Sequence, residues 1–161
     1  MLRTYDDNDT SHHLTPEKME RLKMDLLDLE KTQRPLTVDD LSQALKKGDL
    51  SENAEYQDAK ARLARIDGRV FSIKERLKNA IVIERGPSES GDVRIGSTVL
   101  LSVNGHQREY QILGSQETNP ARGRISHLSP LGSALLGHAA GETVTVTAEN
   151  GTTAYGIIRV T

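Results

Sequence analysis

Apolar residues recur at helical spacing through the first half of the chain. On the second of two predicted helices their positions alternate in steps of four and three: Ala59, Leu63, Ile66, Val70, Ile73, Leu77 and Ala80. This heptad seam over residues 52–79 predicts a rod of about 42 Å at 1.5 Å per residue. A seam on one helix needs a partner, so we expect the preceding helix to pack against it as an antiparallel coiled coil.

The preceding helix has a clear start and a change of phase. Thr15 is a suitable N-cap and Pro16 a suitable first helical residue. Pro35 lies where the apolar spacing changes phase, so a kink or short break is expected there, and Gly48 is expected to end the helix. The apolar positions are Leu22, Leu26, Leu29 and Leu36, followed out of phase by Leu41 and Leu45.

After Pro87 the pattern changes to short strands separated by turn residues. Asn104-Gly105 and Asn150-Gly151 are strong hairpin signals. Ser129-Pro130 predicts the start of a short helix that runs through Leu135 and Leu136. The predicted strands are Ser97–Val103, Gln107–Leu113, Arg124–Leu128, Thr143–Thr147 and Ala154–Val160. The second half is therefore expected to be a small antiparallel α+β domain.

These patterns divide the chain into four segments. Residues 1–13 are polar and without periodicity, and we expect a mobile tail there. Residues 14–83 form the predicted helical hairpin, and residues 92–161 the predicted sheet domain. Residues 84–91, which carry glycine, proline and serine, are the expected linker.

Composition narrows the function classes only mildly. The net charge of the 161 residues is −2, so no global basic field favours nonspecific nucleic-acid binding. The absence of cysteine excludes disulfides and thiolate metal sites. No long apolar run and no signal peptide are recognised, so we expect a cytoplasmic protein. The five histidines do not cluster at ligand spacing, and no metal site is expected in the isolated chain.

The junction between the two helices carries the most informative chemistry. Asp49 and Glu52 have the spacing of a capping box at the start of the second helix. The same two carboxylates stand at the turn of a hairpin, from which they could reach a metal ion in another molecule. On these residues alone, the cap is the favoured interpretation.

The wider sequence resembles a known family. The segment Gly48-Asp49-Leu50-Ser51-Glu52-Asn53-Ala54-Glu55-Tyr56 is similar to the tip motif of the bacterial Gre transcript cleavage factors, closest to the GreA type. Further matches are Arg69, Leu77-Lys78-Asn79-Ala80, Ile95-Gly96-Ser97-Thr98-Val99, Ser129–His138 and Gly141-Glu142-Thr143-Val144. The last three resemble the FKBP-like C-terminal domain of that family.

The resemblance implies a specific activity. Such factors bind bacterial RNA polymerase through the C-terminal domain and insert the coiled coil into its secondary channel. Asp49 and Glu52 would then help to hold a second Mg²⁺ and orient the water that cuts backtracked RNA near its 3′ end. Asn53, Glu55 and Tyr56 would support the tip. The chain would not be an enzyme alone, because the polymerase holds the rest of the site.

Basic side chains on the second helix have two interpretations. By resemblance, Lys60 and Arg62, nearest the tip, are candidate contacts for the RNA 3′ segment. Alternatively, this basic face, which includes Arg69 and Lys74, pairs with acids of the first helix. Those acids would be Asp25, Asp28 and Glu30. For Tyr56, packing at the end of the coil is favoured over stacking on a base.

Three other functions are weighed against transcript cleavage. A regulator of the same family could occupy the channel and modulate or inhibit the polymerase without stimulating cleavage, but the intact pair Asp49 and Glu52 argues against it. A prolyl isomerase needs an aromatic pocket, and the second half has only Tyr110 and Tyr155. An assembly module would dimerise through its seam, whereas a hairpin already satisfies its own seam, so a monomer is expected.

Overall fold

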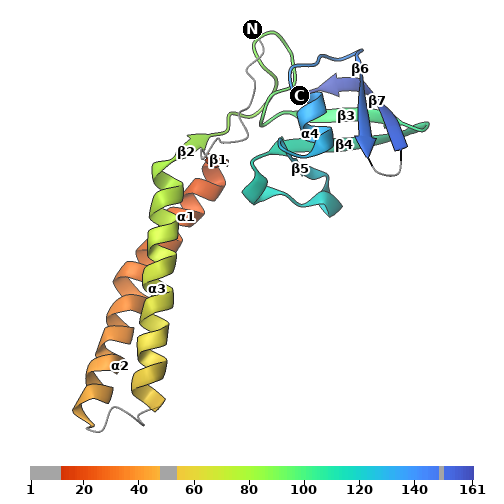
Figure 1. The fold of residues 1–161 in the computed structure, drawn as a ribbon. Coiled ribbons are helices and arrows are strands. Elements are labelled where there is room, and N and C mark those ends of the chain that lie inside the picture. The colour runs from red at the N-terminus through yellow and green to blue at the C-terminus, as the bar shows by residue number, and fades with distance from the viewer. Residues whose placement is uncertain (1–11, 48–53, 149–150) are drawn as a thin grey trace. The chain divides into compact units, whose positions relative to one another are not determined.

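The computed structural model describes residues 12–47, 54–148 and 151–161 (Figure 1). These residues fall into two compact units. One unit comprises residues 19–79 and is helical, and the other joins residues 80–161 to the chain before residue 19. The start of the first helix therefore belongs with the sheet unit.

The helical unit is an antiparallel hairpin, as predicted. Its first arm consists of α1 (Pro16–Asp28), a π-helical turn η1 (Leu29–Gln33) and α2 (Arg34–Lys46), and its second arm is α3 (Ala54–Lys78). Figure 1 shows α2 and α3 side by side. Ion pairs between the arms show that the arms run antiparallel. From one pair to the next, the residue number falls on the first arm while it rises on the second. The pairs are Lys47–Glu55, Asp40–Arg62, Arg34–Asp67 and Glu30–Lys74.

The phase change near Pro35 is produced by the π-helical turn rather than by a break. In η1 the backbone N–H of Arg34 donates to the carbonyl of Leu29, five residues earlier instead of four. A proline at position 35 cannot donate a backbone hydrogen bond, and its ring would clash with the carbonyl of Lys31 in a regular α-helix. One extra residue in the preceding turn accommodates the proline while the helix continues.

This extra residue explains which side chains face α3. The buried residues of the first arm, Leu22, Leu29, Thr37 and Ala44, are spaced by seven, eight and seven positions. The step of eight spans η1. The predicted seam positions Leu36 and Leu45 are wrong for this reason: they are 64% and 46% exposed. Thr37 and Ala44 occupy the seam instead.

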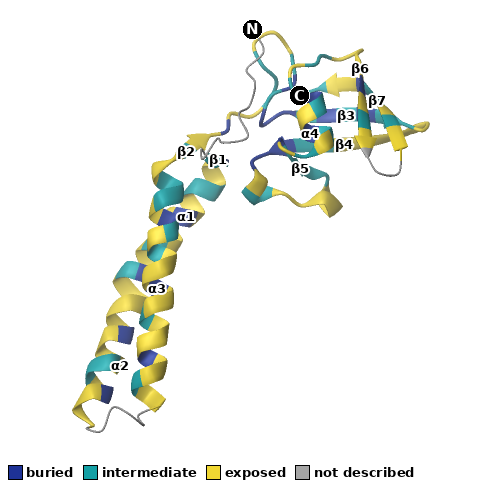
Figure 2. Ribbon diagram, viewed as in Figure 1, coloured by how far each residue is buried: buried dark blue, intermediate teal, exposed yellow. Residues whose placement is uncertain are grey.

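The seam of α3 follows the predicted heptads. Ala59, Ile66 and Ile73 are buried at intervals of seven, and Leu63, Val70 and Leu77 are half-buried between them. The buried bands along both arms are visible in Figure 2. Ala80, the last predicted seam residue, lies beyond the end of α3 in a strand. The buried residues nearest the connection between the arms are the alanines Ala44 and Ala59, so the arms need least separation there.

The sheet unit contains the strands β3 (Thr98–Val103), β4 (His106–Leu113), β5 (Arg124–Ser126), β6 (Thr143–Ala148) and β7 (Gly151–Val160). They form one five-stranded sheet of order β5-β4-β3-β7-β6. Both predicted hairpins, β3–β4 and β6–β7, are confirmed, and Asn104 and Gly105 have the positive φ angles of a two-residue hairpin turn. The expectation of a wholly antiparallel sheet is wrong in one place, because β5 pairs parallel with β4.

The core of this unit lies between the sheet and the short helix α4 (Pro130–Leu135). Ser129 caps that helix as predicted, its hydroxyl accepting a hydrogen bond from the N–H of Gly132 at 3.1 Å. Leu135 is fully buried. The larger of two buried clusters consists of Val93, Val99, Leu101, Ile112, Leu135, Val144 and Ile157, and the smaller of Ile83, Ile95 and Leu113.

A second, two-stranded sheet was not predicted. Strand β1 (His12–Leu14) pairs parallel with β2 (Ala80–Val82), which follows α3. His12 and His13 fall within the segment assigned above to the tail, and Leu14 is fully buried. A three-residue parallel pair between distant segments leaves no periodic signal in the sequence.

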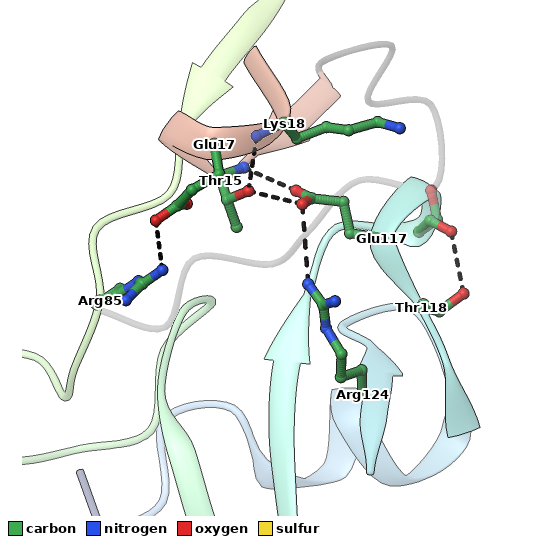
Figure 3. Close-up of polar contacts among 8 residues, drawn as sticks. Thr15, Glu17, Lys18, Arg85, Glu117, Thr118 and Arg124 are labelled. Carbon is green, nitrogen blue, oxygen red and sulfur yellow. Dashed lines mark hydrogen bonds and ion pairs between the residues drawn. The ribbon is translucent and has the colours of Figure 1, made fainter. Parts of the chain in front are cut away.

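The first turn of α1 is fastened to the sheet unit by a buried carboxylate (Figure 3). Thr15 donates from its backbone N–H and its hydroxyl to the two oxygens of Glu117, at 2.7 and 2.6 Å. The Thr15 hydroxyl also accepts from the N–H of Lys18 at 3.2 Å, which confirms the predicted N-cap. Arg124 lies 3.9 Å from the same carboxylate, and Arg85 pairs with Glu17 nearby.

Candidate functional site at the hairpin tip

The predicted catalytic acids lie in the connection between the arms. Asp49, Glu52 and Asn53 all fall within residues 48–53, outside the described residues. Their roles therefore remain predictions from the sequence. The described chain reaches Lys47 on one side of the connection and Ala54 on the other.

The flanks are joined by an ion pair. Lys47 is the C-cap residue of α2, and its N–H donates to the carbonyl of Ala44. Glu55 lies in the first turn of α3. The Lys47 Nζ is 2.5 Å from Glu55 Oε2, so the two arms are bridged immediately before and after the connection. Each charge also suits its helix end, cation at the C-terminus and anion at the N-terminus.

Tyr56 and Lys60 lie one turn apart on α3. Tyr56 is half-buried, which agrees with the packing interpretation. The Lys60 Nζ lies 6.0 Å from the centre of the Tyr56 ring, at the limit of a cation–π contact. Lys60 is otherwise exposed, and its predicted contact with RNA stays a prediction.

Arg62 bridges the arms behind the tip. Its guanidinium lies 3.2 Å from Asp40 of α2 and 3.1 Å from Asp58 of α3. In this arrangement Arg62 is held by two carboxylates, so any contact with RNA would compete with both. The alternative interpretation of this basic face was pairing with acids of the first arm. Asp40 is such an acid but differs from the three expected ones, and Asp58 lies on α3 itself.

Two of the named acids do pair as that interpretation expected. Arg69 lies 3.7 Å from Asp25, and Lys74 lies 2.6 Å from Glu30. The expectation for Asp28 is wrong: it accepts a hydrogen bond from the side chain of Gln33 within its own arm.

Two grooves run along the hairpin. One, of about 270 Å³, lies below the tip and is bordered by the ion pairs of Lys47 and Arg62. A larger one, of about 610 Å³, lies beside the π-helical turn, with Arg62, Arg65 and Arg69 on one side and Leu36 on the other. Within the described ranges, no group of three or more histidine or acidic side chains could hold a metal ion.

The described residues thus form a two-part protein, with an antiparallel helical hairpin joined in sequence to a small mixed sheet. Family models match both parts: "Transcription elongation factor, N-terminal" over residues 12–82 and "Transcription elongation factor, GreA/GreB, C-term" over residues 88–161. The chain belongs to the GreA/GreB family of transcription elongation factors.

The similarity to individual relatives extends over most of their length. The chain is 43% identical over 150 residues to transcription elongation factor GreA of Thermomicrobium roseum, covering 91% of this chain and 95% of that protein. It is 38% identical over 149 residues to GreA of Acetivibrio thermocellus, covering 91% and 94%. The solved GreA factor homolog 1 (Gfh1) of Thermus thermophilus is 26% identical with a TM-score of 0.42, covering 94% and 99%. None of the helices in the described part of the chain is long and apolar enough to cross a membrane.

Proposed function

We propose that this chain binds bacterial RNA polymerase and stimulates endonucleolytic cleavage of the 3′ end of backtracked RNA, which would return arrested complexes to elongation. The observation that carries the proposal is the match of both family models in sequence order, together with the two acids in the connection between antiparallel arms. The coiled coil would enter the secondary channel, and the sheet unit would dock outside it.

The proposed task calls for a long hairpin whose arms pack closely near the connection. Helix α3 has 25 residues and so extends about 38 Å. The buried side chains nearest the connection are alanines, which allow close approach of the arms where space in a channel would be smallest. The chain's own part would be to carry Asp49 and Glu52 to the polymerase active centre.

The donor chemistry at the connection fits Mg²⁺. This ion prefers oxygen ligands, retains several waters and needs only one or two carboxylates from a protein. A second Mg²⁺ beside the one that the polymerase holds would stabilise the attacking and leaving oxygens during phosphodiester hydrolysis. Asp49 and Glu52 would supply carboxylate oxygens and orient the attacking water. With only part of a site, the factor would have no nuclease activity by itself.

The test is a cleavage assay on purified backtracked elongation complexes with labelled RNA and Mg²⁺. The proposal predicts rapid shortening of the RNA 3′ end when the protein is added, and no cleavage of the same RNA when polymerase is omitted. Binding to polymerase without any shortening would instead make the protein a channel-occupying regulator that modulates or inhibits transcription. Cleavage of free RNA would contradict the accessory role.

A further inference from the structure

We infer that Lys47 and Glu55 act as a positioning pair for the acids between them. The inference rests on the proposed function, because it concerns how the connection is presented to the polymerase. The pair, called here the tip pair, joins the last residue described before the connection to the second residue of α3. Its role would be to hold the two ends of residues 48–53 at a fixed separation.

The geometry makes this pair different from the other ion pairs of the hairpin. Among the ion pairs of the described residues it is the one closest to the connection, with a 2.5 Å contact between Nζ and Oε2. Both side chains are mostly exposed, at 60% and 65%. Directly behind it, Arg62 binds one carboxylate from each arm, and Ala44 and Ala59 are buried. The tip pair is thus the outermost member of a short stack of contacts between the arms.

Helix ends fray, and the tip pair stands where fraying would matter most. If the last turn of α2 and the first turn of α3 separate, the connection loses its fixed ends. Displacement of a catalytic group by about 1 Å can cost on the order of 100-fold in rate, so a modest loosening would reduce the fraction of complexes with both acids in place. The effect would fall on the rate of cleavage in the bound complex and leave binding to the polymerase unchanged.

The size of the effect follows from the exposure of the pair. An exposed ion pair changes the equilibrium constant between the arrangement that it stabilises and the separated one by about 1.4-fold to 5-fold. We therefore expect Lys47→Glu and Glu55→Lys each to lower the maximal cleavage rate by at least about 2-fold, since each replaces attraction by repulsion. The double exchange restores the attraction but reverses both charges relative to the helix dipoles, so its rate should exceed both single variants without reaching wild type.

The chain offers a matched control. Lys74 and Glu30 form another lysine–glutamate pair between the arms, with a similar contact of 2.6 Å. Lys74 lies about 29 Å further along α3 than Glu55, at 1.5 Å per residue. Lys74→Glu and Glu30→Lys should leave the maximal cleavage rate of bound complexes unchanged if position at the tip is what matters.

The experiment measures the cleavage rate of backtracked complexes against factor concentration, which separates the maximal rate from the concentration giving half of it. Hydrogen exchange of the amides in the last turn of α2 and the first turn of α3 is measured on the free proteins. For both single tip variants, the inference predicts a lower maximal cleavage rate, an unchanged half-saturating concentration and faster hydrogen exchange. In the Lys47→Glu/Glu55→Lys double variant, the cleavage rate and the hydrogen exchange should both return toward the wild-type values.

Two results would overturn the inference while leaving the proposed function intact. One is a wild-type protein that cleaves and tip variants that cleave at the same maximal rate. The other is a Lys47→Glu/Glu55→Lys double variant whose maximal cleavage rate is no higher than that of the slower single variant, which would mean that each residue acts separately. Failure of the wild-type protein itself to stimulate cleavage would reject the proposed function, and the exchange data would still report whether the tip pair holds the arms.

Discussion

Replacing Glu117 tests how Thr15, the N-cap residue of α1, is held within the sheet unit. Its side chain is only 7% exposed and accepts two hydrogen bonds from Thr15, one from the backbone and one from the hydroxyl. Thr15 is itself buried, so its donors have little access to water once the carboxylate is removed. Both residues belong to the same compact unit, and the contact joins segments 102 positions apart in the sequence.

The loss can be estimated from these contacts. A hydrogen bond to a charged group contributes about 1.5–3 kcal/mol, and a buried donor without a partner costs about 1–3 kcal/mol. Because the two bonds share one carboxylate, we expect Glu117→Ala to lower the free energy of unfolding of the sheet unit by about 2–4 kcal/mol. Thr15→Val keeps the backbone bond and should lose about half as much.

The assay is urea unfolding followed by circular dichroism, with thermal unfolding as a second measure. For a unit of this size, a loss of 2 kcal/mol corresponds to a fall in Tm of at least about 8 °C. Thr118→Ala is the control next to it, since that exposed hydroxyl makes only a long contact of 3.3 Å to the carbonyl of Ser115. A Glu117→Ala protein as stable as the control would refute the assignment of this contact as a structural anchor.

Three further predictions concern packing, close approach and titration. Leu29→Ala should lower the unfolding free energy of the hairpin by about 2–4 kcal/mol in urea titrations, whereas Leu36→Ala should change it by less than about 0.5 kcal/mol, since Leu36 is 64% exposed. Gly114→Ala should destabilise the sheet unit in thermal unfolding, because its Cβ would lie 2.0 Å from a carbonyl oxygen of β1. The backbone N–H of Ala139 donates to the carboxylate of Glu142 and lowers its pKa, so an NMR titration should find that pKa below the ordinary value of a glutamate. The stabilisation is present above the ordinary pKa and is lost as the pH falls through the lowered pKa.

The sequence predicted the elements well and the details of the first arm less well. Heptad spacing located α3, and capping residues located the starts of α1 and α4. The phase change at Pro35 was visible, but a proline is compatible with a kink, a break or a π-helical turn. Only the structure distinguishes these, and the choice decides whether Leu36 or Thr37 faces α3.

Nonlocal pairings could not be read from the sequence. Strand β1 is three residues long and its partner β2 follows the whole hairpin, so neither periodicity nor a turn residue indicates the pairing. The parallel contact of β5 with β4 was missed for the same reason. At the site, the ion pair of Arg62 with Asp40 depends on the register of the arms, which the π-helical turn shifts by one residue.

The acids themselves were identified by their residue types within a motif, not by geometry. Asp-x-x-Glu alone favours a helix cap. Only the resemblance to the Gre tip motif connects the same residues to transcript cleavage, and that role stays a prediction. Glu55 was named only as a supporting residue of that motif, and its contact with Lys47 emerged from the structure.

The most direct test of the central claim is a Mg²⁺ titration of RNA cleavage in backtracked complexes saturated with wild-type or Asp49→Ala/Glu52→Ala protein. We predict that the wild-type protein raises the cleavage rate and lowers the Mg²⁺ concentration at which half of the maximal rate is reached. The variant should bind the polymerase equally well yet leave the rate at its level without factor. A variant that binds and stimulates cleavage like wild type would contradict the assignment of these acids to the second metal ion.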